Sequence, residues 1–278
     1  MTALKKLVFL AKTSYRVVRQ PKIVRGSSEV ESEYSDGWNQ YWDHLKRART
    51  LNEWLSIPGL EPATSYFNVE GKLRHLSFDS TGFYRTTLVD ALVQNFPQSS
   101  SVTEFGSGLG RNVLYLKSRM PKLNIYGYEL CKPGVEIARE AAKKFDVDCQ
   151  YSQLDYVRDP QSAYIFPVTD VAFTMFSLEQ IPRRNQEAVE HIRDHCVLGS
   201  IHIEPVPENY PLTFRGLLGK LDHWKVDYLS GFDRNVRALD FADVSVKRLS
   251  SSHNPLMFPS LYVLRKSAGG NTTSAGRN

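Results

Sequence analysis

Three glycines, Gly106, Gly108 and Gly110, lie between a short strand-like run and an amphipathic helix pattern. Glycine lets the backbone turn tightly and approach a ligand, and the first turn of the following helix leaves backbone N–H groups free. The acidic residue Glu104 lies two positions before the first glycine. The pattern predicts a ligand-binding turn. It does not select the ligand, because many α/β proteins contain such a turn.

The spacing of the turn disfavours a nicotinamide dinucleotide as the ligand. The dinucleotide fingerprint is GxGxxG, whereas this chain has GxGxG followed by Arg111. An arginine in place of the third glycine would obstruct the close packing of helix and strand that a dinucleotide turn needs. A nucleotide-dependent oxidoreductase is therefore a disfavoured alternative.

Two carboxylates follow at the ends of two further predicted strands. Glu129 ends the run NIYGYE, and Asp155 ends the run CQYSQLD. A carboxylate at the end of the second strand can accept hydrogen bonds from both hydroxyls of a ribose. Asp155 would lie where a third strand delivers a carboxylate to an adenine amino group. A single carboxylate at the end of a strand is more often solvated than bound to a ligand. The prediction of a ligand site therefore rests on the position of both carboxylates at the ends of successive strands.

The elements that must position these residues alternate between strand and helix patterns from residue 101 onward. Runs such as VTEF, NIYGYEL, DVAFTMF and GSIHIEPV are separated by helical segments, and VSVKRL and SLYVLRK follow as an antiparallel pair. We expect a doubly wound α/β fold with a mainly parallel seven-stranded sheet and a reversed C-terminal strand. The chain of 278 residues, 41% of them hydrophobic, is long enough to bury such a core.

Four regions are predicted along the chain. Residues 1–28 form a basic amphipathic arm, and residues 29–100 a helical, aromatic N-terminal extension or cap, with a polar hinge at 26–36 and a helix at 81–95. Residues 101–266 form the core, with a lid insertion at about 205–236. Residues 267–278 read as a disordered tail rich in Gly, Ser, Thr and Asn.

Together, the motifs resemble those of the class I S-adenosylmethionine-dependent methyltransferases, across residues 101–266. EFGSGLG resembles the glycine motif of that family, YGYEL its ribose-binding strand end, SQLD its adenine-contacting position and FSLEQIP its fourth motif. The resemblance implies an enzyme with a Rossmann-like fold and S-adenosyl-L-methionine as cofactor.

The resemblance also implies a role for each matched position. The three glycines, with Glu104 before them, would line the methionine part of the cofactor. Glu129 would bind the ribose and Asp155 the adenine amine, while Met175 and Phe176 would flank the adenosine and the reacting methyl group. Arg85, just before the core, could pair with the methionine carboxylate, although a surface ion pair is the commoner role of such an arginine.

Methyl transfer from a sulfonium is an in-line displacement that depends on alignment of the acceptor and exclusion of water. A hydroxyl acceptor also needs a general base. The candidates are Glu204 and His202 at the end of one strand and His223 after it. We favour a core role for His202, which makes Glu204 the better candidate. A cofactor-binding module without turnover stays open as a second class.

The acceptor is expected to be a small molecule, a sugar or glycan, or a lipid-linked molecule, methylated at oxygen. Aromatic side chains within residues 204–236 suit stacking on a ring. No (D/N)PP(Y/F) motif follows the fourth strand, and outside the arm the chain is slightly acidic, so a nucleic-acid acceptor is not expected. The sequence does not define the oligomeric state.

The N-terminal arm carries the basic character of the chain. Residues 1–28 contain seven Lys and Arg residues and no acid, within a net charge of +5 for the whole chain. On a helix, one apolar stripe forms, with basic residues along its flank; the stripe comprises Leu4, Leu7, Val8, Ala11, Tyr15 and Val18. The arm could lie on an anionic membrane, dock on the body of the protein, or act as a transit peptide.

Three cysteines, Cys131, Cys149 and Cys196, are too few for a disulfide framework, and none forms a CxxC pair. The chain is therefore expected to be reduced and cytoplasmic, with membrane association through the arm as an option. His191 and His195 have a metal-compatible spacing, but no third ligand is evident, so we predict an ordinary helix surface there and no metal site.

Overall fold

The computed structural model describes residues 3–57, 66–75, 79–157 and 165–267. A seven-stranded sheet in the order β5-β4-β3-β6-β7-β9-β8 forms its centre. The strands are β3 (Ser101–Phe105), β4 (Asn124–Glu129), β5 (Gln150–Gln153), β6 (Thr169–Met175), β7 (Cys196–Glu204), β8 (Asp243–Arg248) and β9 (Ser260–Arg265). The strands from β5 to β7 are parallel, and β9 is antiparallel to both of its neighbours. The predicted fold class is confirmed.

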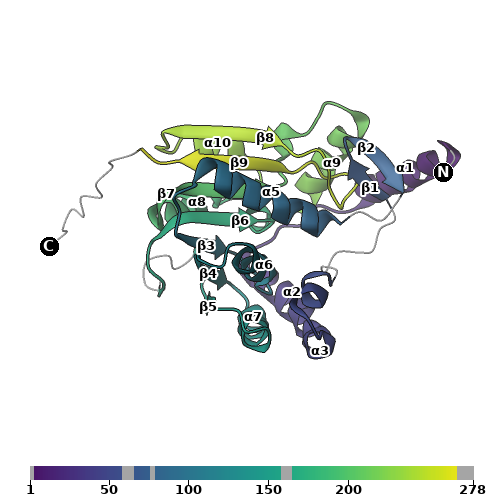
Figure 1. Cartoon of the computed structure of the whole chain (residues 1–278). Helices are drawn as coiled ribbons and strands as arrows, with labels where there is room; N and C mark the ends of the chain where they lie inside the picture. The colour runs from purple at the N-terminus through teal and green to yellow at the C-terminus, as the bar shows by residue number, and fades with distance from the viewer. Residues whose placement is uncertain (1–2, 58–65, 76–78, 158–164, 268–278) are drawn as a thin grey trace.

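Helices cover both faces of this sheet (Figure 1). The helices α5 (Ser80–Asn95), α6 (Arg111–Arg119) and α7 (Lys132–Lys144) pack on one face, and α8 (Asn185–Asp194) and α10 (Phe232–Arg237) pack on the other. Successive residues of a strand point to opposite faces. Phe173 of β6 accordingly joins the core under α5 to α7, whereas Ala172 joins the core under α8 and α10.

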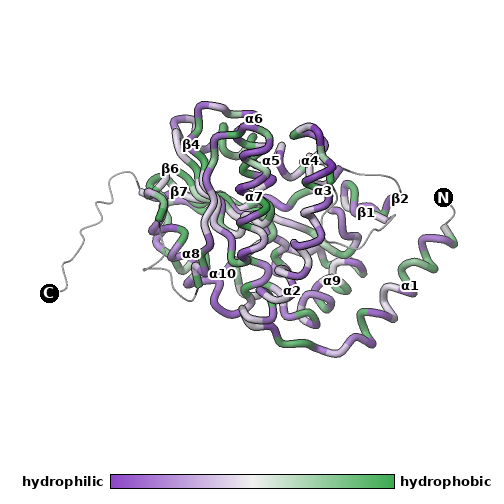
Figure 2. Tube along the Cα trace, turned by 90° about the horizontal axis from the view of Figure 1, so that it is seen from below, coloured by the Kyte–Doolittle hydropathy of each residue, from purple (hydrophilic) through white to green (hydrophobic). Residues whose placement is uncertain are grey.

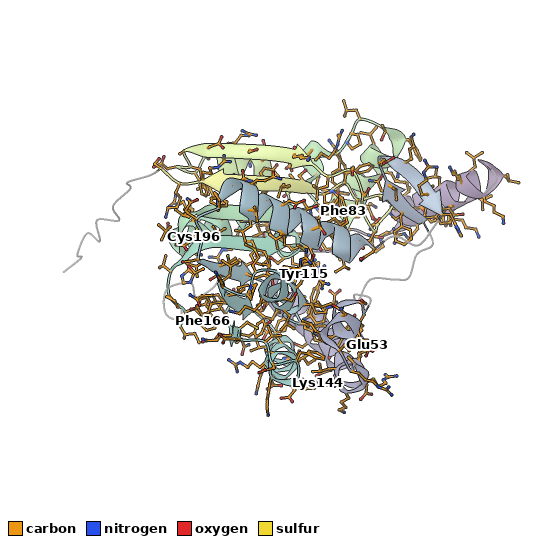
Figure 3. The ribbon with its side chains drawn as sticks, in the orientation of Figure 1. Glu53, Phe83, Tyr115, Lys144, Phe166 and Cys196 are labelled. Carbon is orange, nitrogen blue, oxygen red and sulfur yellow. The ribbon has the colours of Figure 1, made fainter. Side chains whose placement is uncertain are left out.

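The N-terminal cap begins with a helix where a polar hinge was expected. Residues 27–39 form α2 (Ser27–Asn39), which precedes α3 (Tyr41–Arg47) and α4 (Leu51–Leu55). The carboxylate of Glu29 accepts the Gly26 N–H at 3.1 Å, which satisfies a free donor at the start of α2. Lys144, at the end of α7 (Figure 3), donates to the carbonyl of Leu45 at 2.6 Å and so ties α3 to the core.

The remaining elements gather at the carboxyl end of the parallel strands. They are α1 (Ala3–Arg19), the hairpin of β1 (Tyr66–Val69) and β2 (Lys72–His75), the short helices η1 (Leu178–Gln180) and η2 (Pro207–Asn209), and α9 (Phe214–Lys225). Figure 1 shows α1, α9 and the hairpin together at the right-hand end of the sheet. The predicted lid insertion therefore occupies two separate places, because α9 lies at this end of the sheet while α10 packs on the same face of the sheet as α8.

The expectations for the two ends of the chain have different outcomes. The predicted disordered tail lies almost wholly in residues 268–278, which are outside the described ranges. Residues 3–19 of the predicted arm form the helix α1, and none of the helices in the described ranges is long and apolar enough to cross a membrane. The domain boundaries stay a prediction.

Candidate functional site

The glycine turn joins β3 to α6 beside the end of β4. Gly106, Gly108 and Gly110 have φ values of 76°, 52° and 70°, in the region that favours glycine. The N–H of Gly106 donates to the carbonyl of Tyr128 at 2.8 Å, which fixes the turn to β4. A Cβ on Gly110 would lie 2.6 Å from the ring of Tyr151. Glycine is therefore required at this position both for the backbone and for space.

Trp38 of α2 covers this turn. A Cβ added to Gly108 would lie 3.3 Å from the Trp38 ring, and one added to Gly134 of α7 would lie 3.2 Å from it. Among the described residues, Glu104 Oε2, Ser107 Oγ and Trp38 Nε1 are buried polar atoms without a hydrogen-bond partner. Buried polar atoms are nearly always paired. Three exceptions in the strand, the turn and the covering helix fit a polar ligand at this place.

Glu129 ends β4, and Asp155 follows the last residue of the paired strand β5 by two positions. The Glu129 carboxylate accepts the N–H of Gly108 at 2.8 Å and that of Cys131 at 3.0 Å. Burial raises the pKa of Glu129, and these donors oppose the shift. A carboxylate offers about four lone-pair positions, so capacity for ligand hydroxyls remains. Asp155 is half-buried and accepts the N–H of Val157 at 3.0 Å.

Glu104 and Arg85 share one partner, Asn112 of α6. Glu104 is fully buried and accepts from the Asn112 amide at 2.8 Å, and burial raises the pKa of Glu104 to about 8. Arg85 Nε donates to Asn112 Oδ1 at 3.2 Å, and Arg85 Nη1 donates to the carbonyl of Leu55 at 2.9 Å. Arg85 is thus a buried residue beside the acid, and the expectation of a surface ion pair is wrong.

The chain bends sharply after β6. Met175 is half-buried, and Phe176 has a φ of 56°, which is rare for a residue other than glycine. The Phe176 ring packs 4.8 Å from that of Tyr84. The bend brings the next residue, Ser177, against the glycine turn, so that a Cβ on Gly106 would lie 2.3 Å from Ser177 Cβ. The end of β6 and the turn therefore form one surface.

The Glu204 carboxylate binds the backbone of this bend. Glu204 Oε1 accepts the N–H groups of Ser177 and Leu178, both at 3.2 Å, and Oε2 accepts that of Glu179 at 3.3 Å. The carboxylate is fully buried, and burial raises its pKa to about 7. Because three backbone donors surround it, Glu204 is a positioning residue. The expectation that it is the base beside the acceptor is corrected by this geometry.

His202 is a core histidine. Its Nδ1 lies 2.9 Å from Thr174 Oγ1 and its Nε2 lies 2.8 Å from Ser200 Oγ. The ring is fully buried, and burial lowers the pKa of His202 to about 3. With both nitrogens engaged, the side chain cannot reach an acceptor, in agreement with the core role favoured above. His202 is therefore withdrawn as a candidate base.

His223 of α9 has a different environment. Its Nδ1 lies 3.3 Å from the hydroxyl of Tyr210, and its Nε2 has no partner among the described residues. Burial lowers the pKa of His223 to about 4, so the ring is neutral at pH 7. His223 lines a cavity of about 200 Å³ between α9 and the end of α1, together with Asp222 and Tyr228. The role of His223 as a general base stays a prediction.

A polar group of side chains that was not predicted from the sequence lies at this end of the sheet. We call it the Arg25 cluster, and it comprises Arg25, Tyr34, Glu179, Gln180 and Tyr228. Arg25 Nη1 donates to Gln180 Oε1 at 2.9 Å, and its guanidinium lies 5.4 Å from the centre of the Tyr228 ring. Gln180 Nε2 donates to Glu179 Oε1 at 3.1 Å. Residues about 200 positions apart thus meet here.

Two phenols border the Glu179 carboxylate. Burial and the charge of Glu179 raise the pKa of Tyr34 and of Tyr228, so both stay protonated. The Tyr34 ring lies 5.5 Å from that of Trp38, which connects the Arg25 cluster to the glycine turn. The sequence contained a signal for this aromatic face, because Tyr34, Trp38 and Tyr41 follow helical spacing.

The prediction of a helix surface at His191 and His195 is wrong for His195. His195 is 5% exposed, its ring lies 5.7 Å from that of Phe105, and burial lowers its pKa to about 4. It is therefore a core residue. Within the described ranges, no group of three or more His, Cys, Asp or Glu side chains could hold a metal ion. The three cysteines are free.

Comparison with known proteins adds the identity of the fold. No protein-family model matches this chain, and no curated protein matches it in sequence. Among solved structures, the [4+2]-cyclase SpnF has a TM-score of 0.59 and 14% identity, over 90% of this chain and 100% of its own. Magnesium protoporphyrin IX methyltransferase ChlM from Synechocystis PCC 6803 with bound SAH has a TM-score of 0.56 and 10% identity, over 87% and 100%.

A third similar structure is the plantazolicin methyltransferase BpumL in complex with SAH, with a TM-score of 0.51 and 10% identity, over 92% of this chain and 100% of its own. The chain therefore has the fold of the class I S-adenosylmethionine-dependent methyltransferases. The antiparallel β9 between β7 and β8 separates this fold from the all-parallel dinucleotide sheet. SpnF, described as a cyclase, shows that this fold also carries other chemistry.

Proposed function

We propose that the protein is an enzyme that transfers a methyl group from S-adenosyl-L-methionine to an oxygen of a small-molecule, sugar or lipid-linked acceptor. The observation that carries the proposal is the set of unpaired buried polar atoms at Glu104, Ser107 and Trp38. These atoms lie around the glycine turn, whose Gly108 N–H donates to Glu129. A mixed ligand with an amino acid end and a ribose would supply partners for these groups.

The residues of this chain fit that cofactor in three places. Glu104 Oε2 would accept from the ammonium of the methionine part, beside the N–H groups of the glycine turn. Glu129 would accept from the ribose hydroxyls, and Asp155 from the adenine amine. When bound, S-adenosyl-L-methionine supplies an electrophilic methyl group on a sulfonium. Trp38 and Phe176 would exclude water from this position.

Glu179 is our candidate for the base of the reaction. It is buried, it follows the bend after β6, and Glu204 fixes its backbone through the Glu179 N–H. Its carboxylate would take the proton from an acceptor hydroxyl held among Tyr34, Tyr228 and Arg25. The cavity lined by Tyr228 and His223 lies next to this position and would receive the acceptor. A hydroxyl acceptor requires such a base.

This proposal places the enzyme in the cytoplasm, with a membrane within reach through residues 1–28. Three free cysteines among the described residues are compatible with a reducing compartment. A lipid-linked acceptor would be met at the membrane surface, whereas a free sugar or small molecule would be met in solution. Incubation with labelled S-adenosyl-L-methionine and either a membrane extract or a soluble extract distinguishes these sources.

The test of Glu179 is the variant Glu179→Gln. We expect the rate of methyl transfer to a hydroxyl-bearing extract fraction to fall by about 100-fold or more, because general-base catalysis contributes about that factor. The affinity for S-adenosylhomocysteine should stay within about twofold, since Glu179 does not contact the cofactor position in this proposal. Methyl incorporation and calorimetry measure the two quantities.

Glu140→Gln on the exposed surface of α7 is the matched control and should retain the full rate. A Glu179→Gln enzyme with an unchanged rate would remove Glu179 as the base. Bound S-adenosyl-L-methionine without methyl transfer to any extract fraction would instead favour a cofactor-binding module or another reaction on this fold.

A further inference from the structure

The helix α1 packs against the rest of the protein along one of its sides. Phe9 stacks on Tyr66 of the hairpin at 4.0 Å, and Val17 is fully buried in a small cluster with Leu218 and Leu256. The end of the arm is tied down as well, because the N–H of Ile23 donates to the carbonyl of Lys225 at 2.9 Å. The arm therefore has a fixed orientation relative to α9.

The apolar stripe of α1 faces away from the rest of the protein. Its larger members, Leu4, Leu7, Val8, Tyr15 and Val18, are 46–69% exposed. On the helical wheel this outer stripe is centred roughly opposite the docked side, which carries Phe9 and Val17. Figure 2 shows α1 extending past the rest of the molecule, with hydrophobic and hydrophilic residues alternating along it. A contiguous apolar surface of this kind marks a site of interaction.

The neighbouring helix α9 adds a second exposed apolar set. Leu212 before the helix and Phe214, Leu217 and Trp224 within it are 53–86% exposed. The two helices are in contact, because Val17 of α1 packs in one cluster with Leu218 of α9 and Lys22 Nζ lies 4.4 Å from the centre of the Trp224 ring. Single exposed apolar residues are normal on a protein surface, but two adjacent helices that both display them are not.

Basic residues border this surface almost without acids. Lys5, Lys12, Arg16 and Arg19 follow one flank of the outer stripe, and all four are exposed. Within residues 3–25 and 212–225 the single acid is Asp222, and Arg16 pairs with it at 3.6 Å. Long basic side chains beside an apolar stripe suit the headgroup region of an anionic bilayer, where their stems stay in the apolar layer.

We propose that α1 and α9 form one surface that binds anionic phospholipid membranes, with α1 lying in the plane of the interface. The apolar residues of both helices enter the boundary between headgroups and acyl chains, and the basic flank contacts the phosphates. This proposal does not depend on the proposed methyl transfer. A second copy of the chain is disfavoured as the occupant, because the same basic charge would face itself.

The orientation has a consequence for the site. Arg25, which follows the arm, belongs to the Arg25 cluster, and the cavity lined by Tyr228 and His223 lies between α1 and α9. A membrane bound by these helices would therefore lie next to that cavity. If the proposed function holds, a lipid-linked acceptor would enter from this side.

Flotation of the full-length chain with lipid vesicles tests the surface. We use vesicles of phosphatidylcholine alone and vesicles of equal parts phosphatidylcholine and phosphatidylglycerol. The wild-type chain should bind the mixed vesicles, and high salt should weaken this binding. Leu4→Ser/Leu7→Ser/Val8→Ser and Phe214→Ser/Trp224→Ser should each reduce the bound fraction on the mixed vesicles by about tenfold.

The charge variant Lys5→Glu/Lys12→Glu should also reduce binding to the mixed vesicles by about tenfold. Matched controls change exposed residues elsewhere: Val93→Ser/Val197→Ser for the apolar variants and Lys122→Glu/Lys143→Glu for the charge variant. The controls should bind as the wild type does. Circular dichroism and S-adenosylhomocysteine binding report the fold and the cofactor site of each variant.

Two results would overturn the proposal. In one, the wild-type chain stays with neither kind of vesicle, or all variants bind as the wild type does. In the other, sedimentation shows a dimer that the Leu4→Ser/Leu7→Ser/Val8→Ser variant dissociates, which would make the outer stripe an interface between copies. Neither result bears on cofactor binding, so this failure is distinguishable from failure of the proposed function.

Discussion

Buried ionisable side chains distinguish the candidate site at the residue scale. Glu104, Glu129 and Glu204 are all buried, but their partners differ. Glu204 has three backbone donors and Glu129 has two, whereas Glu104 has one side-chain donor and one unpaired oxygen. An acid with few donors in an apolar environment resists ionisation. Glu104 should therefore respond most strongly to pH.

The folded-state pKa of Glu104, about 8, lies above its ordinary value of 4.5. Its contribution to stability is therefore fully present below pH 4.5 and is lost as the pH rises toward 8, because only the unfolded chain ionises freely in this range. Glutamine stays neutral. Between about pH 5 and about pH 8, the free energy of unfolding of Glu104→Gln should fall less than that of the wild type, by on the order of 3 kcal/mol.

Urea unfolding at the two pH values measures this difference. Glu140→Gln, at an exposed position on α7, should follow the wild type at both. Parallel losses of stability in wild type and Glu104→Gln would contradict the assignment of a raised pKa to this carboxyl group.

The glycine turn is the decisive structure at the element scale. Gly110 and Gly71 both have positive φ, at 70° and 72°. A Cβ on Gly110 would meet the buried Tyr151 ring at 2.6 Å, whereas a Cβ on Gly71 would have nothing within 4 Å. The pair thus separates backbone strain from overlap with a neighbour.

Gly71→Ala should cost about 1 kcal/mol, from backbone strain alone. Gly110→Ala should cost at least about 2 kcal/mol more, because the alanine also displaces a packed ring. Urea denaturation measures both. Equal losses of stability would mean that the turn accommodates a methyl group and is not packed as described.

The strands and most helices were predictable at this scale, whereas α2 was not. Alternating strand and helix patterns revealed the sheet because each buried strand has a local apolar signature. Residues 26–36 read as a hinge because they are polar and contain two adjacent serines. The helix forms through a cap at Glu29 and the packing of Trp38 on the glycine turn, and the second of these is a tertiary contact.

At the scale of the whole molecule, the fold brings the N-terminal arm and cap over the carboxyl end of the sheet. Glu129 and Asp155 were predictable because parallel strands deliver their ends to one edge. Glu179 and Tyr34 were not, because their meeting depends on how α2 lies on the sheet. The cofactor half of the candidate site is therefore more evident in the sequence than the acceptor half.

At this scale, we propose that the glycine turn and Glu129 bind an adenosyl-sulfur cofactor. Isothermal titration calorimetry with S-adenosylmethionine, S-adenosylhomocysteine, NADH and NADPH tests it most directly, on the wild type, on Glu129→Ala and on the control Glu140→Ala. We predict that the wild type and the control bind both sulfur compounds and that Glu129→Ala weakens this binding by about tenfold or more. Binding of a nicotinamide cofactor instead, or of none of the four, would contradict this cofactor assignment.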